Sequence, residues 1–209
     1  MASESALTAP YWNTRSPSWY HALVRPRQPV HDAFLQWCTE RGTQALAPIL
    51  DIGCGSSLYY GESFRDTAYT GIDVSSTAIG DCWSRDSHPF HHYEIAGIES
   101  LDTEHRKWGL VFSHAVVDHV PDIPAFLAAS VRAVRPHGWL YLTAYRGFHD
   151  TAQEHVYTMG ADGCWYNDVS PGALRAQLLE CGVHEFSVEP GPVCDPAIGP
   201  ELVCVARVP

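Results

Sequence analysis

The chain has 209 residues, of which 45% are hydrophobic and 18% charged. This composition is typical of one globular domain with a sizeable core, and it excludes a largely disordered chain. Thirteen Lys and Arg residues against 24 Asp and Glu residues give a net charge of −11 with neutral histidine. Such an acidic chain repels phosphate backbones and anionic lipids, so we expect neither nucleic acid nor a membrane as a partner.

The seven cysteines are widely spaced and include no C-x-x-C pair, which predicts free thiols in a reducing compartment. The N-terminus lacks the basic segment and apolar core of a secretory signal, and no apolar run is long enough to span a membrane. We therefore expect a cytoplasmic protein. Monomer and homodimer both stay open.

Residues 1–28 combine prolines with aromatic side chains. The segment is too apolar for a disordered tail and too rich in proline for a long helix, so we expect an arm that packs on a domain of residues 29–209. The aromatic residues of this arm are candidates for a lid over a binding site. Apolar residues then recur at helical spacing, which predicts a first helix within Val30–Leu46.

Short apolar runs alternate with helical stretches through the middle of the chain. The runs are Pro48–Cys54, Ala68–Val74, Phe90–Ala96, Trp108–Ala115 and Gly138–Tyr145. Between them lie Ser75–Arg85, the polar stretch 97–107 and Ile123–Val134. Runs that are apolar on both faces, separated by crossover-length segments, indicate a parallel sheet covered by helices.

The end of the chain has a different pattern. Ser170–Gly182 is predicted to be a helix, and it is followed by two strand-like runs, His184–Glu189 and Leu202–Val208. Residues 190–200 are rich in proline and glycine and too few for a parallel crossover, so these runs should pair antiparallel. The predicted fold is a doubly wound, Rossmann-like α/β sheet of seven strands, the last antiparallel, with helices on both faces.

A glycine-rich turn, D-x-G-x-G, follows the first predicted strand at Asp51–Gly55 and allows a ligand to approach the backbone closely. Asp73 ends the second strand, 22 residues beyond Asp51, where a carboxylate can bind ribose hydroxyls. A nucleoside cofactor is one interpretation. In the other, the glycines only make a tight turn and Asp73 caps the next helix, and G-x-G alone does not decide between them.

Dinucleotides need a third glycine, where this chain has Leu58, and Asp51 would repel a pyrophosphate. S-adenosylmethionine (SAM) fits better, because it offers a ribose and a cationic end and contains no phosphate. Four stretches, Ile49–Ser57, Tyr69–Ser75, Val111–Asp122 and Val134–Leu142, together resemble class I SAM-dependent methyltransferases, in particular their small UbiE-like branch that acts on small molecules. The resemblance covers about residues 30–209.

The resemblance implies a role for each matching residue. The backbone of Gly53, Cys54 and Gly55 would meet the methionine moiety near Asp51, and Asp73 would hold the ribose. The remaining residues implied to contact the cofactor are Val74 on adenine, Gly97 and Ile98 at the adenine edge, and Ser113 and His114 near the sulfonium.

The sequence departs from the family pattern at four places. In the methyltransferase pattern, which differs from that of dinucleotide-binding proteins, Ser57 stands in place of the third glycine. Gly109 replaces an aspartate, and Pro136-His137-Gly138 replaces a Pro-Gly-Gly turn. Gly97 stands where an acidic residue is expected, which leaves adenine recognition to the backbone or to Glu99.

Methyl transfer needs alignment of donor and acceptor, exclusion of water and, for a neutral acceptor, removal of a proton. The catalytic candidates are His114, His119 and Tyr145, which lie at or just after strand ends; a structural role for His119 stays open. The residues expected to contact the substrate are Trp19, Tyr20, Arg146, His155 and Tyr166. The spacing of His114, Asp118 and His119 matches no recognised zinc motif, so we expect no metal.

These features predict methylation of an oxygen or nitrogen of a small molecule by a SAM-dependent enzyme. A non-methylating enzyme with the same cofactor, such as a cyclase or an aminocarboxypropyl transferase, would share every binding motif. An NAD(P)-dependent oxidoreductase and a binder without catalytic activity are further alternatives.

Overall fold

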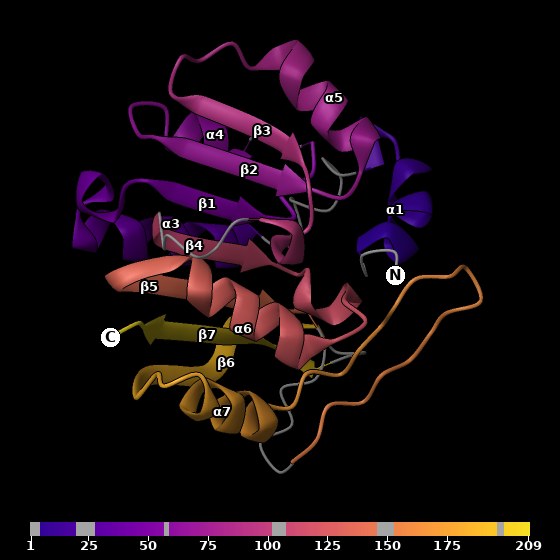
Figure 1. Cartoon of the computed structure of the whole chain (residues 1–209), viewed down its shortest axis with the longest axis vertical. Coiled ribbons are helices and arrows are strands. Elements are labelled where there is room, and N and C mark those ends of the chain that lie inside the picture. The colour runs from indigo at the N-terminus through magenta and orange to yellow at the C-terminus, as the bar shows by residue number, and fades with distance from the viewer. Residues whose placement is uncertain (1–4, 20–27, 57–58, 102–107, 146–152, 196–198) are drawn as a thin grey trace.

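The structure, a computed structural model, describes residues 5–19, 28–56, 59–101, 108–145, 153–195 and 199–209. Within these residues, seven strands form one sheet in the order β3-β2-β1-β4-β5-β7-β6 (Figure 1). The parallel strands are β1 (Ile49–Ile52), β2 (Tyr69–Asp73), β3 (His91–Ile95), β4 (Trp108–His114) and β5 (Val134–Ala144). The predicted seven-stranded doubly wound sheet is confirmed.

Strand β7 (Gly199–Arg207) runs antiparallel to both of its neighbours, β5 and β6 (Glu185–Asp195). The antiparallel last strand is therefore confirmed. Both strands extend further into residues 190–200 than the prolines and glycines there predict. The reason is a shift of register between Pro190 and Cys194, which lets the hairpin continue past residues that cannot donate regular ladder hydrogen bonds.

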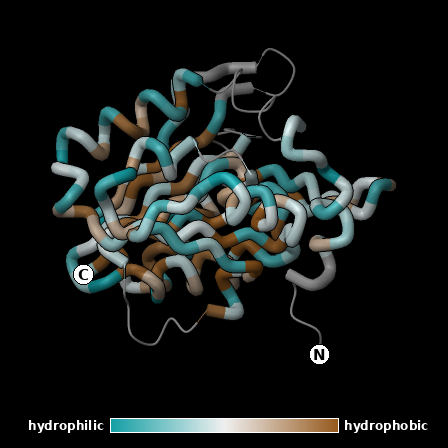
Figure 2. Tube along the Cα trace, turned by 90° about the horizontal axis from the view of Figure 1, so that it is seen from above, coloured by the Kyte–Doolittle hydropathy of each residue, from teal (hydrophilic) through white to brown (hydrophobic). Residues whose placement is uncertain are grey.

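Helices cover both faces of the sheet, as predicted. One face packs against α3 (Gln28–Arg41), α4 (Tyr59–Ser63) and α5 (Ser76–Arg85), and the other packs against α6 (Ile123–Ala133) and α7 (Pro171–Glu180). Along β1 the side chains alternate: Leu50 and Ile52 join the α6–α7 core, whereas Ile49 joins the α3–α5 core. Hydrophobic residues gather along the middle of the molecule in Figure 2.

Local signals fix several helix ends. Ser75 caps α5 and Ser170 caps α7, each accepting a hydrogen bond from the backbone three residues further on. The predicted first helix ends early, at Arg41, because Gly42 adopts a φ of +77°. The rest of that segment, Thr43–Leu46, forms a 3-10 turn, η2.

The turn expected at Pro136-His137-Gly138 is part of β5 instead. β5 begins at Val134, which pairs with Trp108, and Trp139 pairs next with Leu110, so residues 135–138 bulge out of the ladder. His137, with a φ of +62°, lies in this bulge, and its amide donates to the Val208 carbonyl.

The N-terminal arm contains a short helix, α1 (Ser5–Asn13), which lies beside α5 at the edge where the parallel strands end (Figure 1). The same edge carries the glycine turn after β1 and the residues that follow β2, β3 and β4. Open α/β sheets bind ligands at this edge. No helix among the described residues is long and apolar enough to cross a membrane.

Candidate active site

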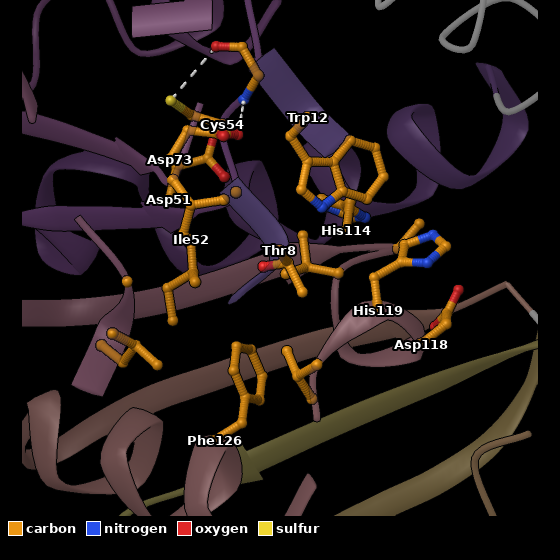
Figure 3. Close-up of a pocket in the computed structure, with 18 of the residues that line it drawn as sticks. Thr8, Trp12, Asp51, Ile52, Cys54, Asp73, His114, Asp118, His119 and Phe126 are labelled. Atoms are coloured by element: carbon orange, nitrogen blue, oxygen red, sulfur yellow. Dashed lines mark hydrogen bonds between the residues drawn. The ribbon is translucent and has the colours of Figure 1, made fainter. Parts of the chain in front are cut away.

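A cavity of about 390 Å³ opens at the carboxyl ends of the parallel strands (Figure 3). We call its two parts the strand-end half and the arm half. The strand-end half is lined by Asp51–Gly55, Asp73, Val74 and Gly97–Glu99. The arm half is lined by Tyr11, Trp12, Trp19, His119, Tyr145 and Tyr166.

Asp73 organises the strand-end half. Its Oδ2 accepts a hydrogen bond from the Gly55 amide at 2.9 Å, and its Oδ1 accepts one from the Ser75 amide at 2.8 Å. Burial raises the pKa of Asp73 to about 6, although these two amides act in the opposite direction. Ser75, and not Asp73, is the capping residue of α5, and each Asp73 oxygen keeps capacity for a further donor such as a hydroxyl.

The glycine turn lines the cavity and packs against Val116, but its amides are used within the protein. Gly53 has a φ of +73° and Gly55 a φ of +57°, and a Cβ on Gly53 would lie 2.2 Å from Val116. The amides of Gly53 and Cys54 both donate to the Ile72 carbonyl, at 2.7 and 3.0 Å. Since the Gly55 amide donates to Asp73, all three of these N–H groups are already used within the protein.

Asp51 adds a second buried carboxylate to the strand-end half. Its Oδ2 accepts a hydrogen bond from the Tyr69 hydroxyl at 2.6 Å, and the residue is only 3% exposed. Burial raises the pKa of Asp51 to about 7; the bond from Tyr69 lowers it, and the nearby Asp73 raises it. Two such carboxylates make this half of the cavity suited to a cation.

His114 lies at the end of β4, where the sequence predicts it, and lines the cavity. Its Nδ1 lies 3.2 Å from the Thr143 hydroxyl, and its ring stacks on Tyr60 with a centroid distance of 5.1 Å. His31 of α3, hydrogen-bonded to the Tyr60 hydroxyl, lies 5.4 Å from His114 between ring centroids.

Sequence reasoning missed His31 and Tyr60 as cavity residues. A signal exists for His31, because His31, Phe34 and Cys38 are spaced to share one helix face and all three are buried. No comparable signal marks Tyr60, which reaches the cavity from the short helix α4.

His119 ends the short 3-10 turn η4 (Val117–His119) and lines the arm half. Its Nδ1 lies 2.6 Å from the Trp165 carbonyl oxygen. A carbonyl can only accept, so Nδ1 carries the proton and the neutral ring has its lone pair on Nε2. Trp12 packs edge-on against the ring, with 5.1 Å between centroids.

A third buried carboxylate, Asp118, braces the loops around His119. Its Oδ2 accepts from the Tyr145 amide at 2.9 Å, and its backbone carbonyl accepts from the Asn167 amide at 2.8 Å. The Asn167 side chain donates in turn to the Val120 carbonyl at 2.7 Å. These bonds hold residues 153–169 against η4 and the end of β5.

Most of the other predicted residues line the cavity. These are Asp51, Gly53, Cys54, Gly55, Asp73, Val74, Gly97, Ile98, Tyr145, Trp19 and Tyr166. Glu99 lines it too, and its carboxylate folds back to within 2.6–2.8 Å of the position that a Cβ on Gly97 would take. Tyr20 and Arg146 lie outside the described residues.

Two predicted residues lie elsewhere, and their assignments need correction. Ser113 is buried, and its hydroxyl donates to the Ile52 carbonyl at 2.9 Å, so it joins β4 to β1 and does not line the cavity. His155 accepts from the Ser170 amide on Nδ1 at 3.0 Å, and its Nε2 lies 3.2 Å from Gln177 Oε1. His155 therefore supports the start of α7 instead of lining the cavity.

The described residues contain no group of three or more His, Cys, Asp or Glu side chains arranged to hold a metal ion. Of the three residues considered for such a group, His114 contacts Thr143, Asp118 accepts from a backbone amide, and His119 contacts a backbone carbonyl.

Comparisons with known proteins agree with this geometry. Residues 50–142 match a family described as "Methyltransferase domain". A ubiquinone biosynthesis O-methyltransferase from Thiobacillus denitrificans is 26% identical over 90% of this chain and 74% of its own length. One from Paraburkholderia phytofirmans is 29% identical over 80% of this chain and 68% of its own.

Solved structures share the fold. The magnesium protoporphyrin IX methyltransferase of Synechocystis PCC 6803, crystallised with bound SAM, superposes with a TM-score of 0.72 at 12% identity, covering all of this chain and 99% of that one. A 1,6-didemethyltoxoflavin-N1-methyltransferase from Burkholderia thailandensis gives a TM-score of 0.59 at 18% identity, covering 93% of this chain and 91% of that one.

Proposed function

The chain is a class I SAM-dependent methyltransferase of the UbiE-like kind, and on that premise we propose that it methylates an oxygen or nitrogen of a small aromatic molecule with His119 as general base. By their names, the ubiquinone biosynthesis relatives methylate oxygen, and the 1,6-didemethyltoxoflavin enzyme methylates nitrogen. The acceptor atom and the base are our inferences from the cavity.

The hydrogen bonding of the glycine turn is the observation that carries the cofactor assignment. A pyrophosphate needs free backbone N–H donors, whereas the amides of Gly53, Cys54 and Gly55 are already used. The turn still offers close approach, and the buried Asp51 and Asp73 favour a cation. This combination supports SAM and argues against an NAD(P)-dependent oxidoreductase.

The residues of the strand-end half fit the parts of SAM. Asp73 would accept from the ribose hydroxyls, and Val74 and Ile98 would border the adenine. The Glu99 carboxylate lies over Gly97, beside the proposed adenine edge. Asp51 would attract the cationic methionine end. When bound, SAM supplies a methyl group already activated by its sulfonium.

The chain's own residues then have to align the acceptor, exclude water and remove a proton. Alignment contributes the larger share, up to roughly 7–11 kcal/mol, and a general base adds about 10²–10⁴-fold. The rings of Trp12, Tyr11 and Tyr166 form an aromatic wall of the arm half, against which a flat aromatic acceptor would pack. The arm would act as a lid that keeps water out.

His119 suits the role of base better than His114. Its Nδ1 proton is held by the Trp165 carbonyl, which leaves the Nε2 lone pair to accept a proton from the acceptor. His114 is enclosed by the rings of Phe34 and Tyr60, and its Nδ1 contacts Thr143. We therefore assign His114 to the wall of the methyl-transfer region and His119 to proton removal.

The test is transfer of a tritium-labelled methyl group from SAM to a panel of phenols and aromatic amines. With the acceptor found, His119→Ala should lower kcat by about 10²–10³-fold, while the Kd for S-adenosylhomocysteine (SAH) measured by calorimetry stays unchanged. His92→Ala, an exposed histidine of β3, is the matched control and should retain full activity.

Each contrary result removes a different part of the proposal. Unchanged kcat in His119→Ala would exclude this residue as the base. Binding of SAH without methyl transfer to any compound of the panel would favour a cyclase or an aminocarboxypropyl transferase. Stabilisation by NADPH and not by SAH would restore the oxidoreductase alternative.

A further inference from the structure

The last turn of α1 is joined to the first turn of α5 by side-chain hydrogen bonds. Asn13 Oδ1 accepts from the Ser76 amide at 2.8 Å and from the Ser76 hydroxyl at 3.1 Å. The Asn13 carbonyl accepts from the Thr77 hydroxyl at 3.0 Å, and the Trp12 carbonyl accepts from the Ser75 hydroxyl at 3.3 Å. Residues more than 60 positions apart in the sequence thus meet at one helix end.

These bonds continue into the strand-end half of the cavity. The amide of Ser75, whose hydroxyl donates to the arm, donates to Asp73 Oδ1 at 2.8 Å. Asp73 Oδ2 accepts in turn from the Gly55 amide at 2.9 Å. One unbroken series of hydrogen bonds therefore joins the arm, the start of α5, the ribose-binding carboxylate and the glycine turn.

The same arm residues also form the wall of the other half. The Trp12 indole packs on His119, and the Tyr11 hydroxyl lies 3.2 Å from the Tyr166 hydroxyl. Thr8 and Trp12 of the arm line the same cavity as Asp73 and His119 (Figure 3). The contact between α1 and α5 therefore connects the arm residues that line the cavity with the residues proposed to bind the cofactor.

We propose that Asn13 is a latch, a positioning residue that couples docking of the arm to binding of the cofactor. With the arm docked, Asn13 satisfies the Ser76 amide, one of the donors that every helix start leaves without an intrahelical partner. That bond steadies the turn from Asp73 to Ser76. By thermodynamic reciprocity, a cofactor that favours the ordered turn must favour the docked arm by the same factor.

The chemistry of the latch distinguishes between two substitutions. Asn13→Ala removes the only side-chain acceptor that the arm presents to the Ser76 amide among the described contacts. Asn13→Asp keeps an oxygen in the same place, and both donors on Ser76 suit a carboxylate at a helix start. A hydrogen-bonded latch is therefore lost in the first variant and retained in the second.

Calorimetric binding of SAH is the first measurement. Removing a helix-capping contact predicts a Kd about five- to tenfold higher for Asn13→Ala, and a Kd within about twofold of wild type for Asn13→Asp. Thr77→Val, which removes only the bond to the Asn13 carbonyl, should raise the Kd by about twofold. Ser18→Ala is the control and should leave the Kd unchanged, because Ser18 is exposed and its hydroxyl bonds only to Ser16 among the described residues.

Limited trypsin digestion is the second measurement, because Arg15 lies in the arm just beyond the latch. SAH should slow cleavage after Arg15 in wild type and in Asn13→Asp, and should protect Asn13→Ala several-fold less. A Kd and a protection by SAH that are both unchanged in Asn13→Ala would overturn the latch. Equal losses in Asn13→Ala and Asn13→Asp would overturn its hydrogen-bonded basis.

The inference rests on the proposed cofactor site and uses neither the acceptor nor the base. Both measurements use SAH binding to the full chain, without turnover. If wild type itself binds no SAH, the proposed function fails. If wild type binds SAH and the variants do not differ from it, only the latch fails.

Discussion

The two halves of the cavity are built in different ways. The strand-end half consists of residues at or just after the ends of successive parallel strands, and backbone amides hold its central carboxylate, Asp73. The arm half is assembled from side chains far apart in the sequence, such as Tyr11 and Tyr166, which are 155 positions apart. On the proposed function, cofactor binding thus depends on the strand ends of the sheet, whereas the acceptor would be enclosed by the arm and by residues 153–169.

The strongest test of this difference is to remove the side chain of Asp73, at the centre of the strand-end half. Asp73→Ala should weaken SAH binding by about 100-fold, because it removes a ribose acceptor and leaves the Gly55 and Ser75 amides without their charged partner. Calorimetry measures the effect. Asp66→Ala, an exposed aspartate at the other end of β2, should bind as wild type does.

Retention of wild-type affinity by Asp73→Ala would contradict the division. It would mean that the arm half, and not the strand ends, carries cofactor binding.

A smaller effect follows from the raised carboxylate pKa values. Asp51, with a pKa of about 7, and Asp73, with a pKa of about 6, are partly protonated at weakly acidic pH. Raising the pH from about 5.5 to about 8 ionises both, so the affinity for cationic SAM should rise about tenfold, and that for SAH, which lacks the sulfonium, by less. Titrations at a series of pH values compare the two ligands.

The variant Asp51→Asn tests whether Asp51 causes this pH dependence of SAM affinity. Because the folded pKa of Asp51 lies above its unfolded value of about 4, ionisation destabilises the unliganded protein increasingly from about pH 4 to about pH 7, and fully above that range. The variant should therefore be the more stable of the two at about pH 8 in thermal unfolding, and should show a weaker pH dependence of SAM affinity. An unaltered pH dependence in the variant would exclude Asp51 as its source.

The smallest expected effect concerns a residue of neither half. His155→Ala should lower the free energy of unfolding by about 1–2 kcal/mol, since it removes the acceptor of the Ser170 amide at the start of α7. SAH affinity and kcat should stay at wild-type values. Urea denaturation measures the first quantity, and a fall in kcat at unchanged stability would return His155 to the acceptor site.

Much of the strand-end half is predictable from sequence, because a parallel sheet places the residues after its strands at one edge. Asp73, Val74, Gly97 and His114 all reach the cavity in this way. Ser113 shows the limit of the rule. It precedes the strand end by one residue, so its side chain points to the opposite side from His114 and bonds to the neighbouring strand.

The arm half resists such prediction. Two isolated bridges, Val156 with Asp168 and Met159 with Trp165, shape the segment that carries Tyr166, and no sequence pattern specifies them. His155 precedes this segment and Tyr166 lies within it, yet only Tyr166 reaches the cavity. Which side chains of a loop point inward depends on long-range contacts that local propensity does not encode.

The tautomer of His119 depends on the position of the loop that carries Trp165, because the Trp165 carbonyl accepts the hydrogen bond from Nδ1. With residues 153–169 in place, the bond to the carbonyl holds the neutral imidazole in the tautomer that carries its proton on Nδ1. With the carbonyl withdrawn, the ring is released to exchange its proton between the two nitrogens. If His119 is the base, as proposed, a movement of this loop would change which of its ring nitrogens can accept a proton, and so would couple proton removal to loop position.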